Sequence, residues 1–377
     1  MVEFNKIKGI TTISIADIGG TIISGGFWFF LATLIEPEEF GELSYYIGIV
    51  SLVGAFCVIS SQETVMVYAS KKFKILPTLY FFSLIGSVIG SLVLMIIFYK
   101  IDLIILLFGY VVNTLAIGEL LGRKEFGNYA KHFLVQKILT LVLGLTFYFL
   151  FDVEGIIYAL GIAYIGFIII FFKRFKISKL EFKMKKEKFK FILYNYLYEV
   201  VGKSNNHLNK LIIVPILGFS VLGNFTLALQ IYNIAMIIPV IVVKYTIPYD
   251  AIGNKQIKLK KITIFVAVGI AISSFFILPI IIPDIFPKYN EVVEAMSFVT
   301  LSIIPMTIAR VYSSELLGNE KSFRLIFSRV VSMIVFIVFI IIFGKDLGLM
   351  GISLGYLIST ICEMACIIFK FNRIEKI

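Results

Sequence analysis

Charged residues are scarce in this chain of 377 residues: Asp, Glu, Lys and Arg together make up 16%, whereas hydrophobic residues make up 59%. Soluble domains average about 25% charged and 45–50% apolar residues. The scarcity of charge excludes a soluble globular protein, because a compact core of this length could not hide so much apolar surface. It excludes a disordered chain for the same reason. The 9 prolines and 28 glycines exclude a collagen-like or low-complexity sequence.

Cysteine is also rare, with only Cys57, Cys362 and Cys366, all in apolar runs. An odd number without paired spacing in loops predicts no disulfide framework. Cys362 and Cys366 lie one helical turn apart, but apart from Glu363 on another face no His or carboxylate cluster joins them. We therefore expect thiols that pack between helices, with no metal site and no cofactor.

Long apolar runs are what the chain has in abundance, and the mean hydropathy is +0.97. The runs continue for about 20 residues, the length of a membrane-spanning helix, and do not alternate as barrel strands do. They predict an all-α integral membrane protein with about 12 transmembrane helices. The predicted spans are 10–35, 43–68, 77–99, 103–122, 130–151, 154–172, 191–217, 221–243, 262–282, 292–317, 323–343 and 348–369. The first is too long for the hydrophobic region of a signal peptide and has no small-residue cleavage site.

Lysine and arginine predict the orientation. With both termini in the cytoplasm, 27 basic residues fall in inner segments and 3 in outer segments, namely Lys100, Lys288 and Lys345. This is the positive-inside pattern, and one missed span would invert every later loop. The net charge of +11 is therefore a sign of topology and not of nucleic-acid binding, and we expect a multi-pass protein of the cytoplasmic cell membrane. The outer loops are too short for a hydrolytic or transferase domain, so we do not expect an enzyme.

The chain also looks duplicated. Leu34–Gly41 ends span 1 and begins span 2, and Ile216–Gly223 does the same for spans 7 and 8, 182 residues later. Val153–Ile156 and Leu349–Ile352 open spans 6 and 12. Six spans followed by six more in the same orientation form a parallel repeat, a common plan among transporters. The predicted domains are an N-terminal six-helix lobe at 1–172, a basic cytoplasmic linker at 173–190 and a C-terminal six-helix lobe at 191–377.

Polar residues gather on one face of span 7. Glu199, Lys203, Asn206 and Lys210 recur at the spacing of one helix face, and His207 widens that face. Charges at membrane depth are costly unless they contact water or a partner. The face therefore predicts a hydrated lumen, and the alternative is an internal Glu199–Lys203 ion pair that only packs helices.

Further charges lie in other spans. Lys244 and Arg310, with the lysines of span 7, make the second half net positive. Ammonium and guanidinium groups suit a phosphate or pyrophosphate headgroup. The predicted substrate-binding residues are Lys203, Lys210, Lys244, Arg310, Asn206 and His207. Asp17 and Glu63 make spans 1 and 2 acidic and, with Glu199, are candidates for coupling or gating. Coupling to H⁺ or Na⁺ and a salt bridge that closes one state both stay open.

Four turns carry a resemblance to known proteins: Leu34–Ser44, Ile282–Tyr289, Leu316–Lys321 and Gly348–Ser353. The first resembles the Pro-x-x-Phe-Gly-x-Tyr/Leu-Ser turn of the polysaccharide and O-antigen flippases (Wzx-like, polysaccharide transporter family). These flippases belong to the multidrug/oligosaccharidyl-lipid/polysaccharide (MOP) exporter superfamily. The second turn resembles their Leu-Phe-Gly-x-x-Tyr turn, with Pro287 where glycine is usual. The last two resemble their span 10–11 turn and the opening of span 12, so the likeness follows the order of the whole chain.

The resemblance implies two six-helix lobes in a MATE-like fold around a central cavity. It implies flipping of a polyprenyl-(pyro)phosphate-linked oligosaccharide from the inner to the outer leaflet by alternating access, for cell-surface polysaccharide or glycan biosynthesis. The implied partners are this lipid-linked glycan and membrane lipids, and glycan-assembly proteins stay open as further partners. Two alternatives remain. One is a cation-coupled multidrug antiporter of the same superfamily, which the basic face of span 7 disfavours. The other is a membrane-embedded glycan polymerase, which would need a large outer loop.

Overall fold

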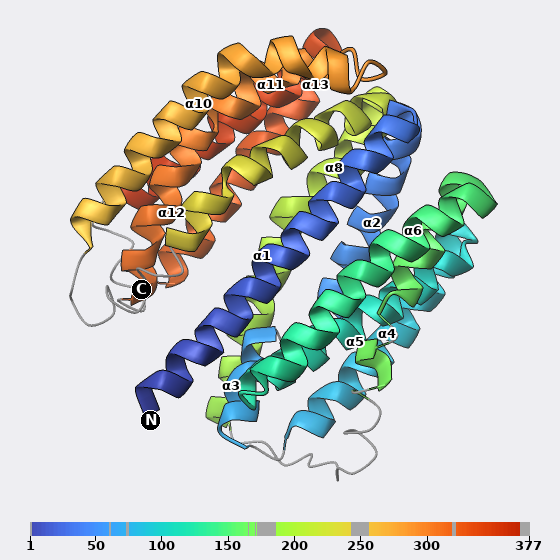
Figure 1. Ribbon diagram of the computed structural model, residues 1–377, viewed down its shortest axis with the longest axis vertical. Helices are drawn as coiled ribbons and strands as arrows, with labels where there is room; N and C mark the ends of the chain where they lie inside the picture. The colour runs from blue at the N-terminus through green and yellow to red at the C-terminus, as the bar shows by residue number, and fades with distance from the viewer. Residues whose placement is uncertain are drawn as a thin grey trace. The chain divides into compact units, whose positions relative to one another are not determined.

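The computed structural model describes residues 2–59, 62–72, 75–164, 166–169, 171, 186–242, 256–318 and 322–369 (Figure 1). The main helices are α1 (Val2–Leu34), α2 (Pro37–Cys57), α3 (Gln62–Ser70), α4 (Leu76–Phe98), α5 (Ile101–Gly122), α6 (Phe126–Ile162), α8 (Lys186–Ala235), α10 (Ile257–Ile285), α11 (Val292–Leu301), α12 (Ile303–Gly318) and α13 (Ser322–Ile368). Within this described part, nine helical stretches are long and apolar enough to cross a membrane. The chain is therefore an all-α multi-pass membrane protein, as the sequence predicts.

Three helices contain one residue with non-helical backbone angles: Asp152 in α6, Gly218 in α8 and Gly348 in α13. These residues lie at the predicted boundaries between spans 5 and 6, 7 and 8, and 11 and 12. The stretches that contain them are 44, 37 and 46 residues long, whereas about 20 residues cross a bilayer. Two spans in each stretch would fit these lengths. The count of twelve and the cytoplasmic termini stay predictions.

Four predicted spans are not single helices within the described residues. Turns interrupt span 6 at residues 163–164 and span 8 at Met236, and spans 2 and 10 are each divided between two of the helices named above. Span 2 is divided between α2, which ends at Cys57, and α3, which begins at Gln62. Span 10 is divided between α11, which ends at Leu301, and α12, which begins at Ile303. The break in span 10 has a covalent cause, because Pro305 has no N–H to donate to the carbonyl group of Leu301.

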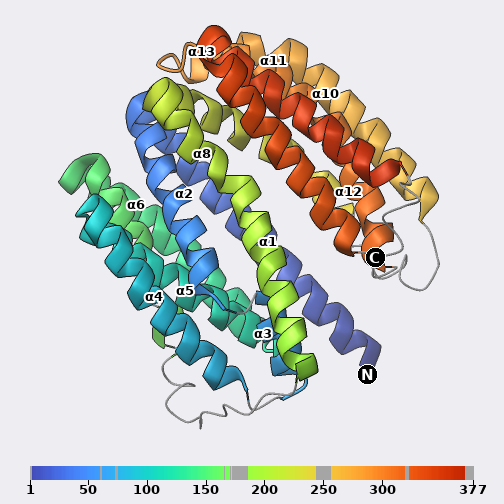
Figure 2. The ribbon, with the colours of Figure 1, turned by 180° about the vertical axis from the view of Figure 1, so that it is seen from behind.

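The structure groups into two compact units. Unit 1 consists of Met1–Leu31 and Tyr46–Ser204, and unit 2 consists of Ala32–Tyr45 and Asn205–Ile377. In unit 1, α4, α5 and α6 run together, and in unit 2, α10, α11, α12 and α13 run together (Figures 1 and 2). Residues 173–185 of the predicted linker lie outside the described residues. The two six-helix lobes joined by that linker stay a prediction.

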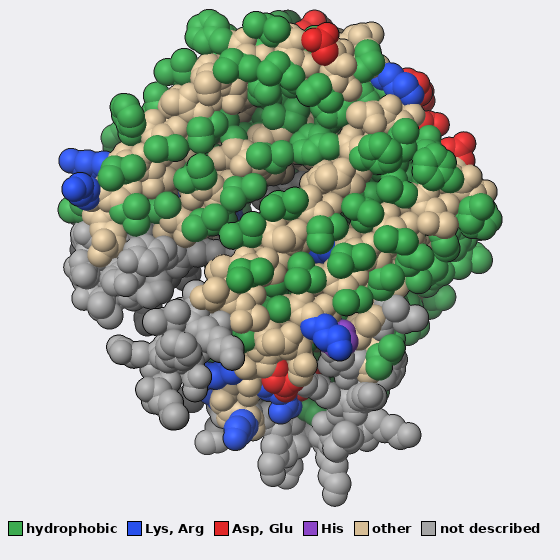
Figure 3. All heavy atoms as spheres, in the orientation of Figure 1, with side chains coloured by type: hydrophobic (Ala, Val, Ile, Leu, Met, Phe, Trp, Pro, Cys, Tyr) green, Lys and Arg blue, Asp and Glu red, His purple; other side chains and the backbone are tan. Residues whose placement is uncertain are grey.

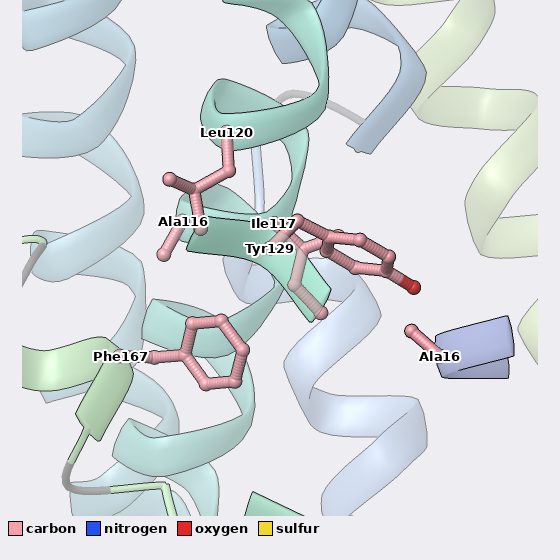
Figure 4. Packing of buried hydrophobic residues seen from close by; sticks show 6 residues of the cluster. All are labelled: Ala16, Ala116, Ile117, Leu120, Tyr129 and Phe167. Atoms are coloured by element: carbon pink, nitrogen blue, oxygen red, sulfur yellow. The ribbon is translucent and has the colours of Figure 1, made fainter. Parts of the chain in front are cut away.

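Each unit has a buried apolar cluster. In unit 1 it combines side chains of α1, α5 and α6 with one from the residues after α6: Ala16, Ala116, Ile117, Leu120, Tyr129 and Phe167 (Figure 4). In unit 2 it combines side chains of α12 and α13: Ala309, Leu325 and Ile367. Apart from Ala16 of predicted span 1, the first cluster draws on the region of predicted spans 4 to 6, and the second draws on predicted spans 10 to 12.

Large apolar side chains also point away from these clusters. Ile22, Phe265 and Ile280 are 68%, 79% and 73% exposed. Hydrophobic side chains cover much of the face shown in Figure 3, over α1, α6 and α10, and the Lys, Arg, Asp and Glu side chains seen there lie mainly near the ends of the helices. A soluble protein does not expose apolar surface on this scale, whereas a lipid bilayer covers it.

The bends inside α6 and α13 have nearly the same backbone geometry. Asp152 has φ 57° and ψ −156°, and Gly348 has φ 54° and ψ −133°. Both have positive φ, which favours glycine. Val153–Ile156 and Leu349–Ile352, the segments that look duplicated in sequence, follow directly after these two residues.

A glycine three residues after each bend makes the same close contact. A Cβ atom added to Gly155 would lie 2.6 Å from the carbonyl oxygen of Phe147, and one added to Gly351 would lie 2.7 Å from that of Phe343. The spacing between each glycine and its contact is the same in both bends. The equal backbone angles and equal contacts support the internal duplication at this junction.

Candidate functional site

Nine residues were predicted to form the site, and the structure describes the side chains of six. In unit 1 these are Asp17, Glu199 and Lys203, and in unit 2 they are His207, Lys210 and Arg310. The side chains of Glu63 and Asn206, and all of Lys244, lie outside the described residues. The polar face of span 7 therefore contributes to both units, because α8 passes from unit 1 into unit 2 after residue 204.

Lys203 contacts a carboxylate and an aromatic ring within unit 1. Its Nζ lies 3.9 Å from Oε1 of Glu199, one turn earlier in α8, and 5.7 Å from the centre of the Tyr110 ring on α5. Gly54 of α2 leaves room for that ring, since a Cβ atom there would lie 2.5 Å from a ring carbon of Tyr110. The Glu199–Lys203 ion pair, which was the alternative to a hydrated lumen, is therefore present.

Asp17 is held by a tyrosine from a distant part of the sequence. The Tyr129 hydroxyl at the start of α6 donates a hydrogen bond of 2.6 Å to Oδ1 of Asp17 on α1. Tyr129 is buried in the cluster of Figure 4, and its ring stacks on Phe133. A hydrogen bond to an ionised acceptor is stronger than one between neutral groups. The pair fixes a half-buried carboxylate inside a predicted span.

Lys210 contacts α2 within unit 2. Its Nζ donates to the backbone carbonyl oxygen of Ser44 at 3.3 Å. An ammonium group has three donors, and within the described part of the chain no carboxylate forms an ion pair with this one. His207 lies three residues earlier on the same helix and is half-buried. A cation at membrane depth whose acceptor is a neutral carbonyl group is suited to an anionic ligand.

Arg310 of α12 has an exposed side chain, although it lies inside a predicted span. Together with Arg329 it is close enough to Glu363 to interact electrostatically, and Ser332 hydrogen-bonds the same carboxylate. The position of Glu363 near the inner end of its span predicts partial exposure. That prediction is wrong, because Glu363 is only 9% exposed, and the two guanidinium groups offset only part of the cost of its burial. The three side chains of Arg310, Arg329 and Glu363 together carry a net positive charge.

The same prediction of partial exposure is wrong for Glu119 of α5. This residue is buried, and it accepts hydrogen bonds from the Tyr80 hydroxyl at 2.8 Å and from Nε of Arg123 at 2.6 Å. Arg123 follows one turn later and its side chain reaches solvent. The two donors explain how a carboxylate can be buried here.

The turn between α1 and α2 is fixed locally by its own residues. Pro37 stands at the first position of α2, where its missing N–H leaves no helical hydrogen bond unmade. The Glu39 carboxylate accepts a hydrogen bond of 2.9 Å from the backbone N–H of Glu36, as in a capping box. Glu38 and Glu39 also place negative charge at the positive end of the helix.

This turn packs against the second of the resembling turns, between α10 and α11, within unit 2. Nζ of Lys288 donates to the carbonyl oxygen of Leu34 at 2.8 Å and pairs with Oε1 of Glu36 at 3.0 Å. The Tyr289 ring meets the Phe40 ring edge-on, with centroids 6.0 Å apart. Burial, and then the nearby carboxylates, raise the pKa of Tyr289 above its usual range, so its hydroxyl stays protonated. The sequence motifs mark both turns, but they do not predict this contact.

No protein-family model matches the sequence, and no curated protein is significantly similar to it. Solved structures are similar in fold. A multidrug resistance MATE family transporter of the MOP superfamily, in an inward-facing conformation, shares 16% identity over 97% of this chain and 98% of its own, with a TM-score of 0.71. The lipid II flippase MurJ, in an inward closed conformation, shares 14% identity over 95% of this chain and 86% of its own, with a TM-score of 0.73.

A third structure of this fold is a MOP superfamily transporter from Pyrococcus furiosus, described as having a binding pocket of reverse polarity that suggests a different function. It shares 16% identity over 99% of this chain and 94% of its own, with a TM-score of 0.62. Identities this low establish a common fold and leave the substrate open. The MATE-like fold predicted from the sequence is confirmed, and the chain has the fold of MOP-superfamily transporters.

Proposed function

We propose that this protein moves a polyprenyl-(pyro)phosphate-linked oligosaccharide from the inner to the outer leaflet by alternating access. The product would serve the synthesis of a cell-surface polysaccharide or another glycan, and the proposed location is the cytoplasmic membrane. The protein would act as a transporter and not as an enzyme. We propose the Wzx-like flippases as its relatives within the superfamily, because the four turns described above resemble theirs.

The observation that carries this proposal is the setting of Lys210. Its ammonium group lies inside a predicted span, and its acceptor is the carbonyl oxygen of Ser44 at 3.3 Å, beyond the usual 2.7–3.2 Å of a good hydrogen bond. A phosphate oxygen is a charged acceptor and would satisfy the ammonium group better. Arg310, which belongs to the same unit, would add further positive charge. A lipid-linked pyrophosphate is a substrate that brings such a headgroup to membrane depth.

The fold is compatible with this substrate class, since one protein that shares it is named as a lipid II flippase. Another is described by the polarity of its binding pocket, which is said to suggest a different function. We take the charge at membrane depth as the property that separates substrate classes within this fold. Net positive charge in unit 2 favours an anionic substrate there.

A cation-coupled multidrug antiporter is the second candidate, and one observation favours it. Asp17 is a half-buried carboxylate inside a span, hydrogen-bonded by Tyr129 at 2.6 Å. Such a group can take up H⁺ or hold a cation. The same group would serve as a coupling site in a flippase, so the two candidates differ in the substrate and not in Asp17.

A reconstituted flipping assay tests the proposal. Purified protein is placed in proteoliposomes with a fluorescent polyprenyl-pyrophosphate oligosaccharide, and the accessibility of the label in the outer leaflet is followed over time. The test variant replaces Lys203, Lys210 and Arg310 with alanine. The matched control removes the same number of charges at exposed positions, Lys258, Lys261 and Lys345.

We expect protein-dependent flipping in the natural protein and in the control, and strongly reduced flipping in the test variant with insertion unchanged. Normal flipping in the test variant would contradict the cationic site. Absence of flipping, together with efflux of organic cations that depends on Asp17, would replace the flippase with the antiporter.

A further inference from the structure

The turn between α1 and α2 touches the bend of α8 through backbone atoms within unit 2, and both views show the two elements side by side (Figures 1 and 2). A Cβ atom added to Gly41 would lie 1.9 Å from the carbonyl oxygen of Phe219. One added to Gly223 would lie 1.8 Å from the carbonyl oxygen of Pro37. Distances under 3.0 Å are essentially never seen for real Cβ atoms. Only glycine permits this contact at either position.

The contact is reciprocal with respect to the sequence repeat. Gly223 lies 182 residues after Gly41, and Phe219 lies 182 residues after Pro37. Each repeat therefore contributes a glycine that accommodates a carbonyl group at the equivalent place of the other repeat. We call the packing of residues 34–45 on the second repeat the repeat latch. At its rim it includes the pairing of Lys288 with the α1–α2 turn.

Lys210 is the deeper part of the repeat latch. Leu217 ends the part of α8 before its bend, and Lys210 lies seven residues before it. Pro37 begins α2, and Ser44 lies seven residues after it. At 1.5 Å per residue both are about 10 Å inside the helix ends. Its hydrogen bond to the Ser44 carbonyl oxygen is a polar contact between the two helices at this depth.

One ammonium group is thus the proposed ligand for an anionic headgroup and also a donor that holds the latch. We propose that a pyrophosphate headgroup competes with the Ser44 carbonyl group for Lys210 and thereby releases the repeat latch. This inference rests on the proposed function. It adds a way in which substrate binding would regulate transport, because an anion bound at Lys210 would open the predicted outer end of the spans. A ligand shifts a conformational equilibrium only through its different affinity for the two states. Here the difference arises because one of the three N–H donors of Lys210 is directed at Ser44 in one state, whereas all three can be directed at the anion in the other.

A cysteine at position 44 reports the state of the latch. Ser44 is only 6% exposed, the Ser44→Cys change is nearly isosteric, and the backbone carbonyl group that accepts from Lys210 is retained. The three natural cysteines are first replaced with serine or alanine. The Ser44→Cys protein is then placed in proteoliposomes and treated with a hydrophilic maleimide. The labelling rate of this cysteine measures how often the latch opens.

Three ligands are compared to decide whether the protein recognises a free anion or the headgroup of a membrane-bound lipid. The full polyprenyl-pyrophosphate oligosaccharide, inorganic pyrophosphate and the polyprenol without phosphate are compared. We expect the first to raise the labelling rate about fivefold or more, the lower end of ordinary coupling between sites, and the polyprenol to leave it unchanged. An equal response to inorganic pyrophosphate would assign recognition to the free anion, and a larger response to the lipid would assign it to the membrane-bound headgroup. Unchanged or slower labelling with both anions would overturn the inference.

Two variants and one control sharpen the result. Lys210→Met should label faster without ligand and should lose the response to pyrophosphate. Gly41→Leu should label fast under all conditions, because its side chain prevents the backbone contact. Gly269→Leu is the matched control, since a Cβ atom there meets nothing within 4 Å, and it should behave like the natural protein. If Gly41→Leu does not fold, Lys210→Met alone decides, since an intact ligand response in that variant contradicts the inference.

The flipping assay on the same Ser44→Cys protein separates the two proposals. Flipping without a ligand effect on labelling would reject the latch inference and leave the flippase intact. No flipping of the lipid-linked glycan would reject the flippase, and the inference as stated would be rejected with it.

Discussion

Alanine at Gly155 and Gly351 tests whether the bends in α6 and α13 are equivalent. The added Cβ atoms would lie 2.6 and 2.7 Å from carbonyl oxygens of the preceding helix turn. That turn must shift to admit a methyl group, and overpacking of this kind costs about 1–3 kcal/mol. Alanine regains about 0.5–1 kcal/mol through its better helix propensity. Each variant should therefore lose up to about 2.5 kcal/mol of stability, and the two losses should be similar.

Thermal unfolding in detergent, at one fixed scan rate, measures the effect. A change of 1 kcal/mol corresponds to about 2–4 °C for a chain of 150–250 residues and to less for a longer chain such as this one, so both midpoints should fall by about 1–3 °C. Gly25→Ala and Gly269→Ala are matched controls, because added Cβ atoms there meet nothing within 4 Å. They should raise the midpoint slightly. A rise for Gly155→Ala like that of the controls would refute the close contact, and a fall for only one of the two bends would refute their equivalence.

Three further predictions concern hydrogen bonds to carboxylates, the role of Asp17 in coupling and the backbone bend at Gly348. Tyr129→Phe removes a hydrogen bond to Asp17, and Tyr80→Phe removes one to Glu119. Each substitution should lower the free energy of unfolding by about 1.5–3 kcal/mol, measured by thermal unfolding. Unchanged midpoints would mean that these hydrogen bonds do not stabilise the fold. Asp17→Asn should insert normally but lose any dependence of transport on a pH or Na⁺ gradient, measured in proteoliposomes, and a retained dependence would exclude it as the coupling group. Gly348→Ala should cost about 1–3 kcal/mol, because φ 54° with ψ −133° strains any residue with a Cβ atom; a neutral result would contradict that backbone geometry.

The membrane class and the helical content follow from the sequence alone, because each depends on local composition. A run of about 20 apolar residues crosses a bilayer whatever its neighbours do. The sequence also predicts the duplication, since Gly155-Ile156 and Gly351-Ile352 stand at matching places, although the bends themselves fall on different residues, Asp152 and Gly348. The divided spans 2 and 10 were missed because hydropathy does not register a break inside an apolar run. Pro305 was the available sign for span 10.

The tertiary structure alone decides which polar groups meet. Asp17 and Tyr129 are 112 residues apart and Lys210 and Ser44 are 166 apart, and nothing in local sequence specifies either pair. The acceptor of Lys210 is a backbone carbonyl group, which every residue possesses, so no residue type could mark it. The sequence thus predicts that cations lie at membrane depth, because a charge within an apolar run can be recognised from the sequence. Only the fold determines which of them are neutralised by a carboxylate and which are left to a weaker acceptor, because that depends on contacts between distant helices.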